Sequence, residues 1–179
     1  MVLSIVIGNM FSGKTSELIR RLKRWKHIGK KILVVNSAKD TRSSEEVLQS
    51  HDHVKFECIK VTDIREVVKH PEYHAAEIIA VDEAQFFVGL KDFIEACIES
   101  SKEVVIAGLD ADSNQNKFGE ILDCIPIACE VIKLSALCSR CKDGTPGPFT
   151  KRIVNDQNQE LIGGSDAYIS TCRFHLTEK

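Results

Sequence analysis

The chain has 179 residues, of which 43% are hydrophobic and 28% are charged, a composition typical of one globular domain with room for a small appendage. Its formal net charge of −2 gives no overall attraction to nucleic acid or to an anionic membrane, so a polyanion site would have to be local. We find no leader pattern in 1–11 and no run near the roughly 18 apolar residues of a membrane span. Seven cysteines, an odd number, fit thiols in a reducing compartment better than a disulfide framework. The sequence therefore predicts a soluble, cytoplasmic protein with no nucleic-acid or membrane partner.

Short apolar runs alternate with helical patterns as far as residue 134. The runs at 2–7, 31–36, 54–61, 77–82 and 103–109 are predicted to be strands, and 15–28, 63–70 and 90–101 to be helices. Within the first helix, Leu18, Leu22 and Trp25 recur at helical spacing and should face the core, while the basic residues should lie on a solvated face. This order predicts an α/β fold with a mostly parallel sheet and helices on both faces.

The residue composition of the chain changes after residue 134. The stretch CSRCKDGTPGPF gathers cysteine, glycine and proline, and a second short segment, LIGGSDAYISTCRFH, closes the chain. We therefore expect two domains, 1–135 and a small metal-binding domain at 136–179. Four cysteines lie outside these two segments, in apolar parts of the chain, and are expected to be buried thiols: Cys58, Cys97, Cys124 and Cys129.

The stretch GNMFSGKT matches the phosphate-binding pattern G-x-x-x-x-G-K-[ST] and lies between an apolar strand and a helix, as the mechanism requires. In such a loop the backbone N–H groups surround phosphate, Lys14 reaches the terminal phosphates and the Thr15 hydroxyl binds Mg²⁺. The fold is thus predicted to be of the P-loop NTPase type. The ATP site is assigned to Gly8, Asn9, Met10, Phe11, Ser12, Gly13, Lys14 and Thr15.

Two adjacent carboxylates follow the strand predicted at 77–82, in IIAVDEAQFF. Asp82 is expected to hold Mg²⁺ opposite Thr15, with Gln85 assigned to the same nucleotide and metal site. Glu83 could orient water in an ATPase or accept the proton of a substrate hydroxyl in a kinase. A helicase motor would need a second lobe with an arginine finger, and a GTPase would need an N-K-x-D motif that the chain lacks. The kinase interpretation, with Glu83 as general base, is therefore favoured.

A C-x-x-C pair and, 30 intervening residues later, a C-x-x-H pair supply four ligands from two tight turns. Four ligands without an open position are typical of a closed, structural Zn²⁺ site, here Cys138, Cys141, Cys172 and His175. One such ion would tie together the ends of the segment 142–171.

Ten short strings together give the chain a clear resemblance to the cytosolic-type thymidine kinases, over essentially its whole length. They are GNMFSGKTSELIRRLKR, DTR, SHD, VDEAQFF, AGLDAD, KFGEI, VIKLSALCSRC, FTKR, IGGSDAY and CRFH. The resemblance implies transfer of the γ-phosphate of ATP to the 5′-hydroxyl of thymidine, with deoxyuridine as a second substrate. It also implies feedback by thymidine triphosphate, a homotetramer, and a zinc-bound lasso that covers the nucleoside. The alternative is a P-loop and zinc-ribbon protein that binds nucleic acid and hydrolyses ATP.

The resemblance also assigns the nucleoside site. It implies that the residues around the nucleoside are Met10, Phe86, Leu109, Phe118, Thr150 and Tyr168, and that those near the phosphates and sugar are Asp40, Arg42 and Arg152. The chain departs from its relatives at Asn9, where many have proline and where we expect only backbone to contribute. Ser113 replaces an aromatic residue of animal and poxviral members, so part of the pocket wall should be missing or rebuilt. The loop after Cys141 is about two residues longer than in those relatives.

Overall fold

The computed structural model describes residues 2–40, 47–49, 55–155 and 158–178. Its centre is a six-stranded sheet with the order β5-β2-β6-β7-β1-β8, in which every neighbouring pair is parallel. The strands are β1 (Leu3–Gly8), β2 (Ile32–Ser37), β5 (Ile59–Val61), β6 (Ile78–Val81), β7 (Glu103–Leu109) and β8 (Glu130–Leu134). The predicted α/β fold with a mostly parallel sheet is confirmed.

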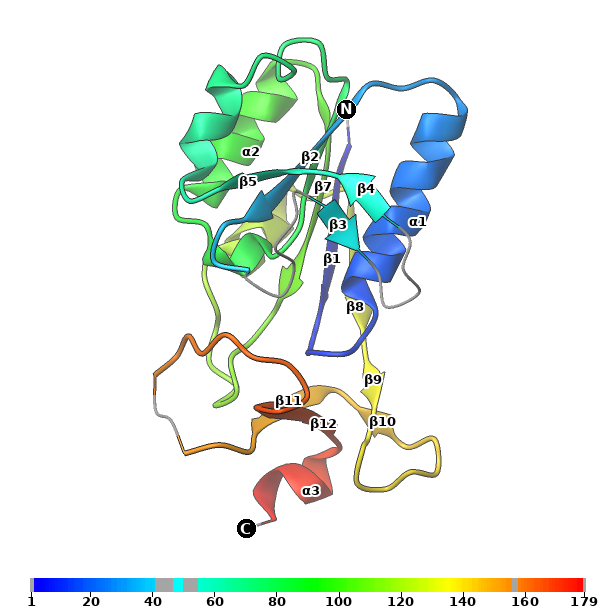
Figure 1. Cartoon of the computed structure of the whole chain (residues 1–179), viewed down its shortest axis with the longest axis vertical. Helices are drawn as coiled ribbons and strands as arrows, with labels where there is room; N and C mark the ends of the chain where they lie inside the picture. The colour runs from blue at the N-terminus through cyan, green and yellow to red at the C-terminus, as the bar shows by residue number, and fades with distance from the viewer. Residues whose placement is uncertain (1, 41–46, 50–54, 156–157, 179) are drawn as a thin grey trace.

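Helices cover both faces of this sheet, with α1 (Lys14–His27) on one side and α2 (Leu90–Glu99) on the other (Figure 1). Alternation along the strands divides the core in two. Ile5 of β1 packs in the cluster that contains Phe93 of α2, whereas its neighbour Val6 packs with Leu18 and Leu22 of α1. As predicted, Leu18 and Leu22 are fully buried; Trp25 is only partly buried against the same cluster.

The range predicted as one strand, 54–61, contains two short strands. Its first part forms β4 (Lys55–Glu57), which pairs with β3 (Val47–Gln49) in a separate antiparallel hairpin, and its second part forms β5 at the edge of the main sheet. Residue 58 lies between them outside either strand. The sequence pattern of 54–61 therefore did not reveal that its two halves pair with different strands.

The predicted helix at 63–70 is a 3₁₀ helix, η1 (Ile64–Lys69). Asp63 caps its start by accepting a hydrogen bond from the backbone N–H of Arg65, and His70 is extended because the following Pro71 disfavours a helical conformation there. Two further 3₁₀ segments are η2 (Ala84–Phe86) and η3 (Ile121–Ile127).

We did not predict β8, and its position explains why. It is an edge strand with β1 on one side only, and its residues are half-buried or exposed instead of forming an apolar run. Cys129, at the entry to β8, is likewise exposed, so the prediction that it is a buried thiol is wrong; Cys58, Cys97 and Cys124 are buried as predicted.

The part of the chain after Leu134 lies beyond the carboxyl ends of the sheet strands (Figure 1). It contains two small antiparallel pairs, β9 (Ala136–Leu137) with β10 (Pro146–Gly147) and β11 (Phe149–Arg152) with β12 (Tyr168–Thr171), followed by α3 (Arg173–Thr177). We call the segment between the C-x-x-C and C-x-x-H pairs, residues 142–171, the lasso. It faces the edge of the sheet at which parallel α/β folds bind ligands.

Candidate active site

The phosphate-binding pattern forms a loop from the end of β1 to the start of α1. Gly13 ends the loop with a φ of 85°, a left-handed conformation that glycine adopts without strain, and α1 begins at Lys14. Lys14 is buried and its Nζ donates to the carbonyl oxygen of Asn9 at 2.8 Å; the Ser12 hydroxyl donates to the same oxygen at 2.8 Å. The loop is therefore closed on itself, with the first N–H groups of α1 directed at the site.

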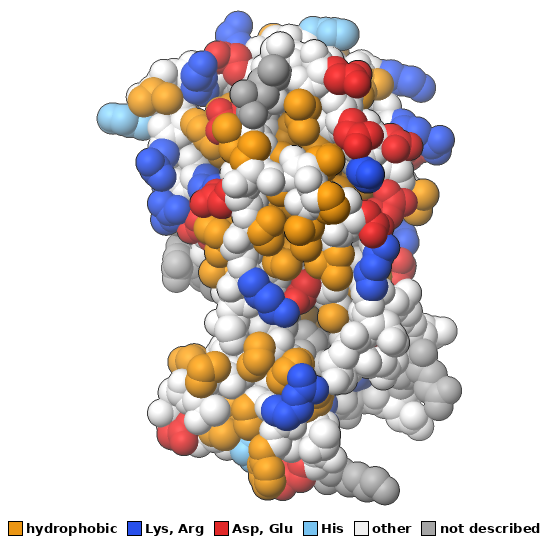
Figure 2. Space-filling view, turned by 180° about the vertical axis from the view of Figure 1, so that it is seen from behind, with side chains coloured by type: hydrophobic (Ala, Val, Ile, Leu, Met, Phe, Trp, Pro, Cys, Tyr) orange, Lys and Arg blue, Asp and Glu red, His pale blue; other side chains and the backbone are white. Residues whose placement is uncertain are grey.

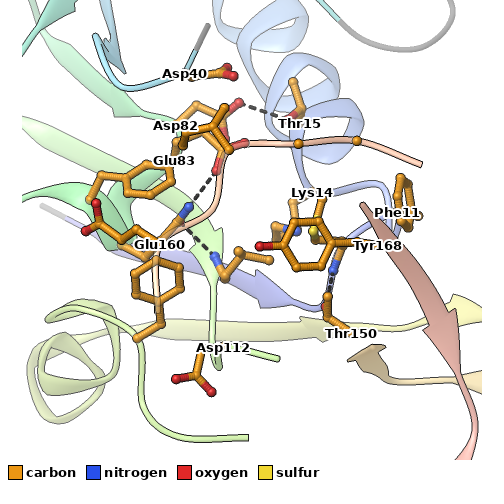
Figure 3. A pocket seen from close by; sticks show the side chains of 18 of the residues that line it. Phe11, Lys14, Thr15, Asp40, Asp82, Glu83, Asp112, Thr150, Glu160 and Tyr168 are labelled. Atoms are coloured by element: carbon orange, nitrogen blue, oxygen red, sulfur yellow. Dashed lines mark hydrogen bonds between the residues drawn. The ribbon is translucent and has the colours of Figure 1, made fainter. Parts of the chain in front are cut away.

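Asp82 and Glu83 follow β6 and lie side by side facing the start of α1 (Figure 3). The Thr15 hydroxyl donates to Asp82 Oδ2 at 2.8 Å, and both carboxylates are buried, with 3% and 8% of their surface exposed. Burial, and next the charge of Glu83, raise the pKa of Asp82 to about 7. Two adjacent buried carboxylates beside a hydroxyl form a donor set that suits Mg²⁺.

One cavity of about 540 Å³ joins these groups to the lasso. It is lined by most of the residues that the sequence assigned to the phosphates and the nucleoside, namely Met10, Phe11, Gly13, Lys14, Thr15, Asp40, Asp82, Glu83, Gln85, Phe86, Leu109, Phe118, Thr150 and Tyr168. The rings of Phe86 and Phe118 meet edge to face, with centroids 5.6 Å apart. The predicted site residues thus come together, although their roles remain predictions.

Four predicted residues stand outside the cavity wall and one cannot be placed. Gly8, Asn9 and Ser12 belong to the loop but do not line the cavity. Arg152 also lies behind the wall, where its guanidinium donates to the carbonyl oxygens of Asn158 and Gln159 and to the Tyr168 hydroxyl. Arg42 and the SHD string lie outside the described residues.

Asn9 contributes its side chain, which corrects our expectation that only its backbone would matter. The side chain is buried between the two parts of the chain: Nδ2 donates to the Gly147 carbonyl at 2.8 Å, and Oδ1 accepts from the Ala136 N–H at 3.2 Å. The Met10 N–H donates to the Thr150 hydroxyl at 3.0 Å. A proline at position 9 could not make the side-chain bonds, so in this chain the phosphate loop is tied directly to the lasso.

The lasso also contacts the segments that follow β2 and β7, through residues that sequence reasoning missed. Gln159 Nε2 donates to Asp112 Oδ2 at 2.9 Å, and Lys39 forms an ion pair with Glu160 at 2.7 Å. Gln159, Glu160 and the following residues 161–165 line the cavity. Asp112 ends the string AGLDAD, and residues 162–165 begin the string IGGSDAY. No periodic pattern in the sequence distinguishes the contact residues from their neighbours.

The four predicted zinc ligands lie together, with their ligand atoms all within 4.8 Å of one another. His175 Nδ1 is 3.6, 3.4 and 3.3 Å from the sulfurs of Cys138, Cys141 and Cys172, and the Cys141 and Cys172 sulfurs are 3.8 Å apart. Tetrahedral Zn²⁺ with ordinary bond lengths requires S–S edges of about 3.8 Å and S–N edges of about 3.6 Å. The group therefore fits a structural zinc site.

Two of these thiols are also suited to act as thiolate ligands. Burial opposes ionisation of Cys138, but hydrogen bonds from the backbone at Cys141, Cys172 and Arg140 lower its pKa to about 6. Backbone and side-chain hydrogen bonds from His175 likewise lower the pKa of Cys172.

A sequence profile of the family described as thymidine kinase matches residues 1–176. The chain belongs to the thymidine kinase family. Thymidine kinase a of Arabidopsis thaliana is 39% identical over 178 residues, covering 96% of this chain and 73% of that protein. The cytosolic thymidine kinase of Homo sapiens is 37% identical over 177 residues, covering 99% and 74%. The thymidine kinase of Myxoma virus (strain Uriarra) is 38% identical over 170 residues, covering 94% and 92%.

Family membership makes the chain a nucleoside kinase, a transferase, as the ten strings predicted. It does not favour the alternative of a nucleic-acid-binding ATPase. Among the described residues, no helix combines the length and the apolar character needed to cross a bilayer.

Proposed function

We propose that this member of the thymidine kinase family transfers the γ-phosphate of ATP to the 5′-hydroxyl of thymidine, and of deoxyuridine as a second substrate. The observation that carries the proposal is the single cavity in which Lys14 and Thr15 of the phosphate loop meet Glu83 and the aromatic wall of Phe86 and Phe118. A phosphate site, a base and a nucleobase-sized apolar wall are the three parts that a nucleoside kinase needs.

In this proposal the phosphate loop holds ATP in line with the acceptor hydroxyl. The backbone N–H groups of residues 8–15 and the start of α1 surround the β- and γ-phosphates, and the Lys14 ammonium neutralises charge as the phosphoryl group moves. Glu83 accepts the proton of the 5′-hydroxyl as the new P–O bond forms, while the bond from the γ-phosphorus to the bridging oxygen breaks and ADP leaves. Glu83 is well placed because it follows Asp82 directly and therefore lies beside the metal site.

Thr15 and Asp82 are the residues that would hold Mg²⁺, because the hydroxyl and the carboxylate already lie 2.8 Å apart at the mouth of the phosphate loop. When bound, the ion would offset negative charge on the ATP phosphates.

The nucleoside would lie between the sheet and the lasso. Phe86, Phe118 and Tyr168 line the cavity and would offer aromatic surface for the base. Met10 and Leu109 would complete the apolar wall, and Asp40 would lie near the sugar. Arg152 contributes through Tyr168, whose ring and hydroxyl it contacts, and not by reaching into the cavity. Arg42 is retained on the resemblance alone.

We further propose a boundary near residue 135 between an ATP-binding domain, 1–135, and a zinc-binding lasso domain, 136–179. The support is the end of the main sheet at Leu134 and the position of all four zinc ligands beyond it. Cytoplasmic location, a homotetramer and feedback by thymidine triphosphate are proposed from the family resemblance.

The decisive experiment incubates the purified protein with Mg·ATP and a panel of thymidine, deoxyuridine, deoxycytidine and purine deoxynucleosides, and identifies the products. We expect thymidine monophosphate and deoxyuridine monophosphate. Deoxycytidine should be rejected, because a site that bonds the N3–H of thymine would face an acceptor instead and leave a buried group unpaired. Equal efficiency with deoxycytidine and thymidine would contradict this selectivity.

The same preparation tests the nucleic-acid alternative, which predicts ATP hydrolysis stimulated by DNA or RNA and indifference to nucleosides. The surface gives that alternative little support. On the face in Figure 2, acidic and basic side chains are interspersed around an apolar centre. On α1, Arg20 and Arg21 both pair with Glu17, which offsets the positive charge of that helix.

A further inference from the structure

Gln85 is among the most completely buried of the side chains that line the cavity, with 2% of its surface exposed. It belongs to η2, directly after Glu83 and Ala84. The motif assigned it to the nucleotide and metal site, but its polar atoms are used elsewhere. Its amide Nε2 donates to Glu83 Oε2 at 2.6 Å, and its Oε1 accepts from the Leu109 N–H at 2.9 Å.

These two bonds fix which end of the amide faces Glu83. A backbone N–H can only donate, so the atom that faces Leu109 must be the amide oxygen, and the atom that faces the carboxylate must be the NH₂ group. Two consecutive hydrogen bonds therefore run from the Leu109 N–H at the end of β7 to Gln85 and from Gln85 to Glu83. The bond to Glu83 is charge-assisted and short, as expected for a strong contact.

The surroundings of Gln85 are shaped to hold it in this orientation. A Cβ on Gly108 would lie 2.5 Å from Gln85 Oε1, and a Cβ on Gly119 would lie 2.1 Å from the Gln85 carbonyl oxygen. Both separations are too short for any side chain, so glycine at these two positions leaves room for Gln85. Glu83 itself has a φ of 50°, a left-handed conformation that is uncommon for a residue other than glycine and that needs support from its surroundings.

We infer that Gln85 is a positioning residue for the general base: it orients the Glu83 carboxylate toward the acceptor hydroxyl and links that orientation to Leu109 in the nucleoside wall. This inference rests on the proposed function, because Glu83 needs a hydroxyl to act upon. Binding of ATP does not require Gln85 in this scheme. A base displaced by about 1 Å loses much of its effect, so the loss of Gln85 should appear in kcat.

Two substitutions separate positioning from nucleotide binding. Gln85→Glu keeps the shape and an acceptor for the Leu109 N–H but turns the donor that faces Glu83 into a second acceptor. Gln85→Leu removes both bonds. A hydrogen bond to a charged group is typically worth about 10- to 100-fold in rate, and we expect losses of that size in kcat for both variants. The KM for ATP should stay within about threefold. Gln115→Glu, which adds the same charge at an exposed position, should leave kcat unchanged.

The deciding measurement is a double-mutant cycle with Glu83→Gln. If Gln85 acts through Glu83, Gln85→Leu should change the residual rate of the Glu83→Gln enzyme by less than about threefold, because there is no base left to orient. An unchanged 10- to 100-fold loss in that background would overturn the inference, as would a raised KM for ATP with normal kcat. Gly108→Ala provides a second route to the same perturbation if Gln85→Leu folds poorly, and should also lower kcat selectively.

The wild-type protein measured alongside separates this inference from the proposed function. A wild type that phosphorylates thymidine together with Gln85 variants of normal kcat overturns the positioning role alone. A wild type that phosphorylates none of the nucleosides overturns both.

Discussion

Replacing Cys141 with serine should show what the zinc site does. The substitution removes one of four ligands from the group whose spacing fits tetrahedral zinc. Structural zinc contributes on the order of 10 kcal/mol to small domains that are unfolded without it, enough to decide whether the lasso orders. We therefore expect the zinc content to fall from about one per chain to well below that, and limited proteolysis to cut within 142–171.

The effect on thymidine can be estimated from what the lasso supplies to the cavity. Tyr168 contributes a buried ring, and loss of an aromatic stacking surface costs about 1–3 kcal/mol. Thr150 and the backbone of 161–164 line the cavity, and their polar contacts to a bound nucleoside would be worth about 1 kcal/mol each. A total of about 3–5 kcal/mol corresponds to a loss of about 10²- to 10⁴-fold in kcat/KM for thymidine.

ATP should be much less affected, because its proposed site is built by residues 8–15 and 82–83. Only the bonds from Asn9 and Met10 to the lasso and its flank would be lost, so the affinity for ATP should fall by no more than about tenfold. Isothermal titration with ATP, steady-state kinetics with thymidine and elemental analysis together test these expectations. Cys129→Ser, an exposed cysteine outside the zinc group, is the matched control and should behave as wild type. A zinc-free Cys141→Ser enzyme with normal thymidine kinetics would refute the reasoning.

Four further substitutions test the assignments outside the zinc site. Glu83→Gln should lower kcat by about 10²- to 10⁴-fold while ATP still binds, and Glu99→Gln, on the exposed end of α2, should have no effect; near-normal turnover in the first would remove the general base. Lys14→Ala should raise the KM for ATP and lower kcat together, and an effect on only one of them would be inconsistent with contact to phosphate throughout the reaction. Tyr168→Ala should raise the KM for thymidine by about 10-fold or more and that for ATP much less, so equal changes would argue against stacking. Hydrogen bonds from two arginines lower the pKa of Glu17 from its ordinary 4.5 to about 2, so its stabilising effect should be present above about pH 4.5 and lost toward pH 2. Because the pair is partly solvated, Glu17→Gln should reduce the free energy of unfolding by about 1 kcal/mol at pH 7 and by little at pH 2; a pH-independent difference in urea titrations would show that the ion pairs are not the cause.

The parts of the site that the sequence predicted are those carried by residues close together in the chain. The phosphate loop combines a strand, a glycine-rich turn and a helix in adjacent segments, so motif and periodicity specify the same structure. The zinc ligands were predictable because two local pairs each have the spacing of a ligand turn. Asp82 and Glu83 were predictable because they end a buried apolar strand.

The parts that were missed depend on contacts between distant polar residues. Asn9 bonds to Gly147 and Gln159 bonds to Asp112, and such pairs leave no periodic trace because each partner is a single polar residue in a loop. The positioning role that we infer for Gln85 was not predicted, for a related reason. A motif indicates which residues gather at a site, but only the positions of the Leu109 N–H and the Glu83 carboxylate show which way an amide is directed.

The cavity wall near Ser113, where animal and poxviral relatives carry an aromatic residue, also contacts the lasso. The neighbouring Asp112 is buried and accepts the backbone N–H groups of Asn114 and Asn116, which fix its carboxylate in the loop. Its other oxygen accepts from Gln159, an exposed residue of the lasso. A bond of this kind is worth about 1.5–3 kcal/mol at most, and less where water competes. Zinc bound by the Cys3His group would therefore supply most of the energy that orders the lasso. The polar contacts of Gln159 and Glu160 then determine where the lasso lies relative to Asp112 and Lys39.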